Sequence, residues 1–371
     1  MRTIEGPHEP YSPAWNTAFP LGDDELEQRD AHNAPTVLYI GGCGRSGTTL
    51  LARMLGQVPQ VSNVGEVRDI WLKGRIQNRL CGCGARFSDC PFWTRVGLEA
   101  FGGWDRIDAH EMVRLRSALD RPWLFPLLAA RGRRSFEADV ARYTFMLDRL
   151  YRAIRATAGV KVIVDASKFP TYSLLLRRAD LDVRLVHVVR DSRGVAHSWQ
   201  KKVAVTDSPD KPIFMPRYGL LAGAALYAAY NLQTELIRFC CRVPYLFLRY
   251  EDLVKDPDGG MRRVLAHAGL ATGSLELPFL GDGNVRLEVD HTVMGNPIRM
   301  KTGALEIARD DGQVLGLERT FVSAVTLPLL VRYGYLPPRP RTSPWPRGGD
   351  HGAPGSSSPS RRAGGAGSGE V

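Results

Sequence analysis

Four short runs of apolar and β-branched residues stand out along the chain, at 36–40, 160–164, 184–189 and 244–249. A stretch with helical spacing or a helix-start signal follows each run. Short runs with few polar interruptions are typical of strands that are buried on both faces. Strands that alternate with helices predict an α/β fold, in which a parallel sheet is flanked by helices on both sides.

Between residues 71 and 158 the strand signals stop and helical spacing replaces them. Residues 108–119 and 136–156 predict two helices, the second with a single apolar stripe. This stripe consists of Val140, Tyr143, Leu147, Leu150, Tyr151 and Ile154. We interpret 71–158 as a helical insertion. It either covers the carboxyl edge of the sheet as an acceptor lid, where ligands bind in open α/β folds, or packs against the flank of the sheet.

The two ends of the chain differ in composition from the middle. Residues 1–34 are rich in Pro, Asp and Glu and predict a loosely ordered arm. Residues 338–371 are rich in Pro, Gly and Ser, which cannot bury enough apolar surface to fold, and predict a disordered tail. One domain is therefore expected over residues 35–337.

No targeting or membrane signal is found in the sequence. The N-terminus has no apolar segment of the secretory type, and the most apolar stretch, 219–232, is too short to span a membrane and predicts a buried helix. Six cysteines in 371 residues form no disulfide framework. A cytoplasmic location is therefore expected, without a membrane span. The oligomeric state has no sequence signal.

The formal net charge of +10 suits a polyanionic ligand. Nucleic acid would also suit this charge, but the chain has no basic stripe, zinc-finger spacing or aromatic RNA-binding signature. We therefore expect a phosphate-bearing small ligand and no nucleic-acid partner.

A glycine-rich turn, residues 42–49, joins the first predicted strand to a predicted helix. Such a turn directs backbone N–H groups and the positive end of the helix dipole at an anion. It fits the frame of a nucleotide phosphate loop, except that Thr48 replaces the lysine that a nucleoside triphosphatase needs, and the cation comes earlier, at Arg45. The alternative is a tight turn without a ligand. The displaced cation favours an anion other than a magnesium-bound triphosphate.

A second candidate anchor follows the strand predicted at 184–189. There Arg190 ends the strand, and Asp191 or Ser192 can cap the next helix. An N-cap with a surface salt bridge would explain an isolated Arg-Asp pair. An arginine fork with a nearby hydroxyl would instead suit a phosphate dianion.

Together these motifs resemble those of sulfotransferases that use 3′-phosphoadenosine-5′-phosphosulfate (PAPS). The segment 44–50 is similar to the 5′-phosphosulfate loop of that family, in the arginine form of its carbohydrate and tyrosyl-protein branches. The 3′-phosphate site of the family pairs an Arg at a strand end with a Ser eight positions later, as Arg190 and Ser198 do here. The segment 248–253 resembles the Tyr-Glu-Asp-Leu segment of the family, which would place Tyr250 beside the adenine.

The resemblance extends less securely to residues 295–303, which occupy the place of the basic C-terminal glycine loop but depart from its form. Arg299 or Lys301 would reach the 3′-phosphate there. The cofactor-binding residues implied by the resemblance are Gly44, Arg45, Ser46, Gly47, Thr48, Thr49, Arg190, Ser198, Tyr250 and Arg299.

The resemblance implies a three-layer, P-loop-like fold, and we expect a bacterial member of the family. It implies in-line transfer of a sulfonate from PAPS to an acceptor hydroxyl, with release of 3′,5′-adenosine bisphosphate and without a catalytic metal. We expect the acceptor to be a small molecule, lipid or sugar alcohol. The alternatives are a P-loop kinase or NTPase, which the missing lysine opposes, and a non-catalytic nucleotide-binding protein.

For the chemistry, Arg45 and Lys168 are the candidates that stabilise charge on the leaving oxygen. Cytosolic relatives carry a histidine base where Lys168 stands, so the base must lie elsewhere. Glu66 stands close to the spacing of a Gly-Glu pair in the tyrosyl-protein branch and is the preferred base; the alternative is a helix cap. Asp165 is the reserve base, or it orients Lys168. Structural roles are expected for His187, His197 and His291.

Cys81, Cys83 and Cys90 lie within ten positions of one another. Zinc would need a fourth ligand, and no nearby His completes a standard pair. Structural thiols in a tight turn, a structural zinc site and a disulfide therefore all remain open. Cys240 and Cys241 are expected to lie in the core.

Overall fold

The computed structural model describes residues 34–336, except 125, 127, 129–133, 209–212, 282 and 308–313. The predicted arm (apart from residue 34) and the predicted tail at 338–371 lie outside the described residues.

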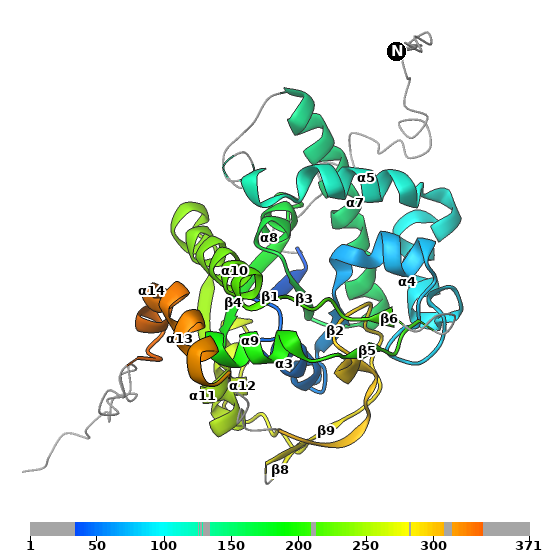
Figure 1. Ribbon diagram of the computed structural model, residues 1–371. Helices are drawn as coiled ribbons and strands as arrows, with labels where there is room; N and C mark the ends of the chain where they lie inside the picture. The colour runs from blue at the N-terminus through cyan, green and yellow to red at the C-terminus, as the bar shows by residue number, and fades with distance from the viewer. Residues whose placement is uncertain are drawn as a thin grey trace, which may run out of the picture.

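A five-stranded parallel sheet forms the centre of the molecule, with the strand order β2-β3-β1-β4-β7 (Figure 1). The strands are β1 (Thr36–Gly41), β2 (Val61–Gly65), β3 (Val162–Lys168), β4 (Asp182–Val189) and β7 (Tyr245–Arg249). The predicted α/β fold with a parallel sheet is confirmed. The edge strand β2 was not predicted, because its sequence VSNVG mixes polar with apolar residues. Strand β3 also continues through 165–168, beyond the strand predicted at 160–164.

Alternate side chains of β1 enter two separate cores. Val37 and Tyr39 point into one, and Leu38 and Ile40 into the other. The first core is closed by α7 (Arg134–Ala158), α8 (Pro170–Arg177) and part of α10 (Leu220–Cys241). The second is closed by α3 (Thr48–Leu55), α11 (Tyr250–Lys255) and α12 (Pro257–His267). Because successive side chains of a strand point to opposite faces, both faces of the sheet are buried. The helices on each face and the sheet between them form three layers.

The described residues between β2 and β3 are mainly helical. The predicted helices correspond to α5 (Ala109–Leu119) and α7, and the predicted stripe on α7 is buried. With α4 (Pro91–Phe101), these helices pack in the same core as Val37 and Tyr39, against the flank of the sheet.

The remaining elements are η2 (Val67–Asp69), η3 (Ile70–Ile76), η4 (Phe87–Asp89), η5 (Trp104–Arg106), η6 (Pro122–Leu124), α9 (Ser192–Gln200), β5 (Ala204–Val205), β6 (Ile213–Phe214), β8 (Leu280–Gly281), β9 (Asn284–Leu287), η7 (Pro297–Met300), β10 (Gly303–Glu306), α13 (Gly316–Val325) and α14 (Leu327–Arg332).

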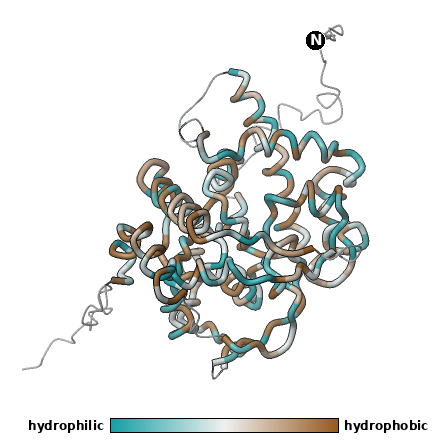
Figure 2. The backbone as a smooth tube through the Cα atoms, viewed as in Figure 1, coloured by the Kyte–Doolittle hydropathy of each residue, from teal (hydrophilic) through white to brown (hydrophobic). Residues whose placement is uncertain are grey.

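The helix α10 is only half buried, in contrast to the buried helix predicted at 219–232. Figure 2 shows hydrophobic residues along much of its length. Tyr227 and Ile237 face the protein, whereas Leu221 and Phe239 are more than 60% exposed. The last two residues of α10 are cysteines that were both expected in the core. Cys241 is buried, but Cys240 is exposed, so the expectation for Cys240 is wrong. Among the described helices, none is long and apolar enough to cross a membrane.

Candidate functional site

A cavity of about 570 Å³ lies where the carboxyl ends of the central strands meet. Most of the residues that the sequence assigned to a site line it, although they come from five separate segments. They are Gly44, Arg45, Gly47, Thr48, Thr49, Glu66, Lys168, Arg190, Ser198 and Tyr250. Parallel strands bring such distant segments to one edge of the sheet.

The glycine-rich loop has a backbone that only glycine tolerates at two points. Gly42 has φ 120°, and a Cβ atom there would lie 2.2 Å from the Val188 carbonyl oxygen. Gly47 has φ 84° and precedes α3, and a Cβ atom there would lie 2.2 Å from the Tyr250 ring. No side chain in the described part of the chain caps the first turn of α3. Gly47, Thr48 and Thr49, which begin this helix, line the cavity, so the uncapped first turn is placed where an anion site would need it.

Replacing Gly47 with alanine should lower the free energy of unfolding by about 2–3 kcal/mol, because φ becomes strained and the methyl group displaces Tyr250. Urea unfolding measures this loss. Gly219→Ala is the matched control, since nothing lies within 4 Å of a Cβ atom there. Equal stability of the two variants would show that the loop can shift away from Tyr250 at no cost.

Arg45 places a half-buried cation at the cavity. Its backbone is left-handed, with φ 72°, and its guanidinium lies over the Trp199 ring at 5.1 Å. Its Nε and Nη2 atoms are buried and have no hydrogen-bond partner within the described residues. Burial also lowers the pKa of Arg45 below its usual value. A cation with two buried nitrogens that lack acceptors is suited to binding an anion, which would satisfy both nitrogens.

Arg190 connects the loop to the aromatic wall of the cavity. Its Nη1 donates a hydrogen bond to the Arg45 carbonyl oxygen at 2.9 Å, and its guanidinium lies 5.0 Å from the centre of the Tyr250 ring. Asp191 caps α9 by accepting from the Arg193 N–H at 2.9 Å, as the capping interpretation predicted. Asp191 therefore caps α9 while the preceding residue, Arg190, lines the cavity, so the two interpretations of this segment are compatible.

Glu66 and Lys168 form an ion pair at the cavity wall. The Lys168 Nζ donates to Glu66 Oε1, and also to the Ala166 carbonyl oxygen at 2.8 Å. The side chains are 18% and 14% exposed, respectively, so both are accessible from the cavity. Glu66 precedes η2, but its side chain does not cap this turn. The helix-cap alternative for Glu66 is therefore wrong.

Asp165 is fully buried behind the cavity. It accepts hydrogen bonds from the Tyr151 hydroxyl, from the Ser167 N–H at 2.8 Å and from the Ser167 hydroxyl at 2.5 Å. Burial raises the pKa of Asp165 to about 6. Asp165 does not line the cavity, so its position does not suit the reserve base.

The raised pKa of Asp165 gives a stability prediction with a definite sign. The folded state holds this proton more tightly than the unfolded chain, whose pKa is near 3.8, so the free energy of unfolding falls as pH rises from about 4 to 6. Asp165→Asn lacks this dependence on pH. Between pH 4 and 7 its free energy of unfolding should therefore rise relative to that of the wild type by up to about 3 kcal/mol. Urea unfolding across that range measures the difference. A difference that is constant with pH would contradict a buried, protonatable Asp165.

Arg299 lies elsewhere than predicted. Its guanidinium is buried, and it donates to the carbonyl oxygens of Thr292 at 2.8 Å and Leu80 at 2.7 Å and pairs with Asp207 at 2.9 Å. It does not line the large cavity, and Lys301 is exposed. The Arg299 donors are used to hold three segments together, so we do not retain it as a nucleotide ligand. Ser46 is also buried rather than cavity-lining, and its hydroxyl has no partner within the described residues.

Aromatic residues besides Tyr250 form much of the cavity wall, and none of these was predicted to belong to the site. Phe169 meets Tyr230 edge to face at 5.5 Å, and Trp199 meets Tyr218 in the same way at 4.8 Å. The position of Trp199, directly after Ser198 on α9, was the one available signal. No described residue of 71–158 lines this cavity, so the role of that insertion as an acceptor lid stays a prediction.

His187, His197 and His291, for which structural roles were expected, do not line the large cavity. His187 is buried, where its ring nitrogens meet the Tyr245 hydroxyl at 2.7 Å and Asn231 at 2.8 Å, and burial lowers the pKa of His187 to about 4. His197 is on α9, and His291 lies beside Cys90. None of them lines the described cavity.

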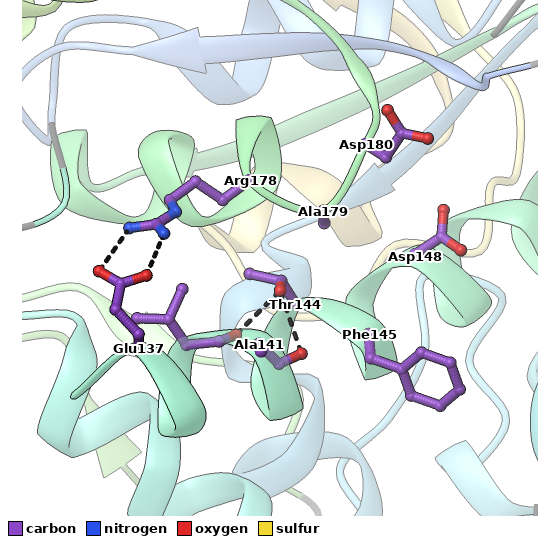
Figure 3. A pocket seen from close by; sticks show the side chains of 9 residues that line it. Glu137, Ala141, Thr144, Phe145, Asp148, Arg178, Ala179 and Asp180 are labelled. Atoms are coloured by element: carbon purple, nitrogen blue, oxygen red, sulfur yellow. Dashed lines mark hydrogen bonds and ion pairs between the residues drawn. The ribbon is translucent and has the colours of Figure 1, made fainter. Parts of the chain in front are cut away.

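A second cavity of about 320 Å³ lies between α7 and the end of α8 (Figure 3). Its polar side chains are paired within the chain, apart from Asp180, which is exposed. Arg178 pairs with Glu137, and the Thr144 hydroxyl donates to the Val140 carbonyl oxygen at 2.8 Å. None of the described residues that line this cavity has a buried polar side-chain atom without a partner, and the large cavity is therefore the candidate site.

Comparison with known proteins gives one family. The profile of the sulfotransferase domain matches residues 35–296. No protein with a curated description matches the chain.

Three solved structures illustrate the similarity. A sulfotransferase domain from the curacin biosynthetic pathway is 16% identical, covers 78% of this chain and 96% of its own, and gives a TM-score of 0.39. One from the Synechococcus PCC 7002 olefin synthase is 19% identical over 81% of this chain and 98% of its own, with a TM-score of 0.39. A sulfotransferase from Alicyclobacillus acidocaldarius is 13% identical over 81% of this chain and 95% of its own, with a TM-score of 0.38.

Proposed function

This chain belongs to the sulfotransferase family, and we propose that it transfers a sulfonate group from PAPS to the hydroxyl of an acceptor. The chain is thus an enzyme that transfers sulfonate groups. The identity of the donor, the class of acceptor and the roles of individual residues are the proposed part.

The observation that carries the proposal is the half-buried Arg45 side chain at the cavity, whose buried Nε and Nη2 atoms have no hydrogen-bond partner among the described residues. Arg45 stands two residues before Gly47, at the uncapped start of α3, and its main-chain carbonyl oxygen accepts a hydrogen bond from Arg190 Nη1. Two separated cationic groups suit a ligand with two phosphates, as PAPS has at its 5′ and 3′ positions. We propose that residues 44–49, including Arg45, bind the 5′-phosphosulfate. Arg190 and Ser198 would then bind the 3′-phosphate, with Tyr250 beside the adenine.

In the proposed reaction the acceptor oxygen forms a bond to sulfur as the bond from sulfur to the bridging phosphate oxygen breaks. Glu66 takes the proton from the acceptor hydroxyl, and the electron pair of the broken bond remains on the released 3′,5′-adenosine bisphosphate. Lys168 and Arg45 stabilise the charge on that oxygen. The ion pair between Glu66 and Lys168 supports this division of roles, because it keeps base and cation side by side.

The cavity lining favours an acceptor with an apolar face. Phe169, Tyr218 and Tyr230 supply aromatic rings, and Met215 and Leu226 add apolar surface. A small-molecule alcohol, a lipid alcohol or the apolar face of a sugar can pack on such a wall.

Nucleotide binding without magnesium tests the donor. Calorimetry should show that 3′,5′-adenosine bisphosphate binds more tightly than 5′-AMP and ATP, because neither of these carries a 3′-phosphate. Tight ATP binding that requires magnesium would contradict the proposal and favour a kinase or NTPase. Turnover of labelled PAPS with an acceptor library then tests catalysis, and binding without any turnover would favour a non-catalytic nucleotide-binding protein.

A further inference from the structure

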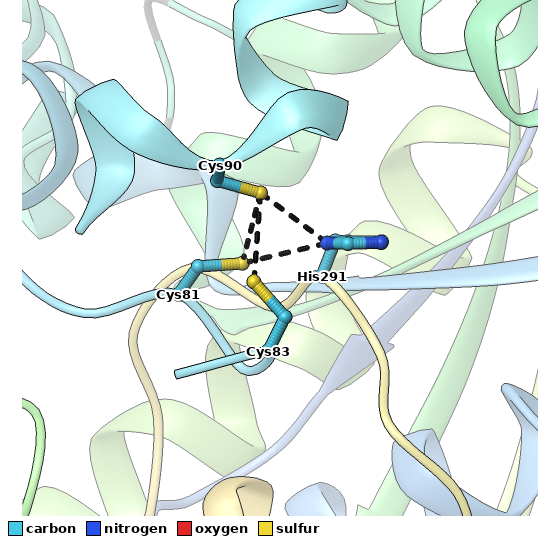
Figure 4. A group of neighbouring side chains, drawn as sticks. All are labelled: Cys81, Cys83, Cys90 and His291. Carbon is cyan, nitrogen blue, oxygen red and sulfur yellow. Dashed lines mark hydrogen bonds between the residues drawn. The ribbon is translucent and has the colours of Figure 1, made fainter. Parts of the chain in front are cut away.

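The fold completes the cysteine cluster with a histidine from a distant segment. Cys81, Cys83 and Cys90 meet His291, and one ligand atom from each lies within 4.8 Å of all the others. Figure 4 shows the three sulfur atoms and the near nitrogen of the imidazole converging on one point. The sequence offered no nearby fourth ligand, because His291 is 201 positions from Cys90.

The spacing of these atoms is that of a tetrahedral metal shell. Zinc bonds of about 2.3 Å to sulfur and 2.0–2.1 Å to nitrogen place neighbouring ligand atoms about 3.5–3.8 Å apart. The Cys83–Cys90 and Cys81–Cys90 sulfur pairs are 3.7 and 3.6 Å apart, and the Nδ1 atom of His291 is 3.8 Å from the Cys81 sulfur and 3.3 Å from the Cys90 sulfur. A disulfide needs about 2.05 Å, and all three cysteines are free.

The surroundings hold this arrangement in place. The His291 ring stacks on Phe92 at 4.9 Å, and its carbonyl oxygen accepts from the Trp93 Nε1 at 3.0 Å. At Gly82 a Cβ atom would lie 2.5 Å from the Thr292 hydroxyl, so glycine is needed for the Cys81–Cys83 turn to approach residues 290–292. The Gly82 N–H also donates to the Thr292 carbonyl oxygen at 3.0 Å. Such outer contacts orient metal ligands.

We propose that Cys81, Cys83, Cys90 and the Nδ1 atom of His291 bind one structural Zn²⁺ ion. The three thiols bind as thiolates and release their protons to solvent, while the imidazole binds neutral. Three sulfurs and one nitrogen form a closed set that leaves no position for a substrate, so the ion is structural.

The site joins the start of the helical insertion to the segment that supports Glu66. Two residues after His291, the Val293 N–H donates to the Val64 carbonyl oxygen at 2.9 Å, and the Glu66 N–H donates to the Val293 carbonyl oxygen at 2.7 Å. Zinc would therefore fix the segment around Val293, which is hydrogen-bonded to the backbone of the candidate base Glu66.

Metal analysis of the full chain tests the site. Inductively coupled plasma mass spectrometry should find about one zinc ion per chain, and cobalt substitution should give the thiolate charge-transfer and ligand-field absorption of a tetrahedral site. Cys90→Ser and His291→Ala should lose most of the bound zinc, whereas the matched control Cys240→Ser, at an exposed cysteine, should retain it. X-ray absorption of the wild-type zinc protein should show three sulfurs and one nitrogen, which does not depend on whether a variant folds. Wild-type protein that binds no zinc after reconstitution, a mass showing a disulfide among these cysteines, or equal zinc loss in Cys240→Ser would overturn the proposal.

Discussion

Replacing Glu66 with glutamine is expected to lower kcat by about 10²–10⁴-fold, the range associated with a general base. The amide keeps the shape of the side chain and can still accept a hydrogen bond from Lys168 Nζ, but it cannot take a proton from the acceptor. Affinity for 3′,5′-adenosine bisphosphate should remain within about twofold, because the proposed nucleotide contacts are made by other residues. Steady-state turnover of labelled PAPS and calorimetry of the bisphosphate measure the two quantities.

Glu306→Gln is the matched control, since Glu306 is a carboxylate that lines the same cavity. If Glu66 acts as the base, the control keeps most of its kcat. If both variants lose kcat equally, the effect comes from the charge of the cavity and not from proton transfer. Retention of full kcat by Glu66→Gln would remove Glu66 from the mechanism.

Arg190→Ala should weaken the binding of 3′,5′-adenosine bisphosphate by about 2–3 kcal/mol, roughly 30- to 150-fold, because a charge-assisted hydrogen bond to the 3′-phosphate is lost. Binding of 5′-AMP, which lacks that phosphate, should change far less. The difference between the two ligands isolates the 3′-phosphate contact by the logic of a double-mutant cycle. Calorimetry without magnesium supplies all four affinities.

This comparison also controls for damage to the site. Arg190 donates to the Arg45 carbonyl oxygen and lies over Tyr250, so its removal could disturb the loop itself. Equal weakening of both ligands would mean that Arg190 acts only through the loop. Arg193→Ala offers a neighbouring arginine for comparison, because Arg193 is paired with Asp191.

The sequence predicts this sheet well where each strand is a continuous apolar run. Strand β1 lies at the centre of the sheet with both faces buried, so all of its residues carry the same signal. Strand β2 lies at the edge and includes Ser62 and Asn63, whose polarity hides the strand. Local pattern therefore reports burial more directly than it reports strand pairing.

The candidate site divides in the same way. Arg45, Glu66 and Arg190 follow strand ends, and position in a parallel sheet is enough to bring them together. Arg299 was misassigned because its partner Asp207 is 92 positions away, and no local pattern reveals that pairing. His291 was missed as a candidate metal ligand for the same reason. Long-range partners become visible only when the chain is folded.

The position of β1 at the centre of the sheet has a consequence for how the chain folds during synthesis. The hydroxyl of Tyr39 on β1 donates to the Phe169 carbonyl oxygen, 130 positions later. At about 5–20 residues per second, the ribosome needs roughly 7 to 26 seconds to make the intervening segment. During that time the hydrophobic strand β1 has neither of its neighbours β3 and β4, and its edges can pair with other chains. We therefore expect production to benefit from added chaperones, which can cover β1 until β3 and β4 have been made.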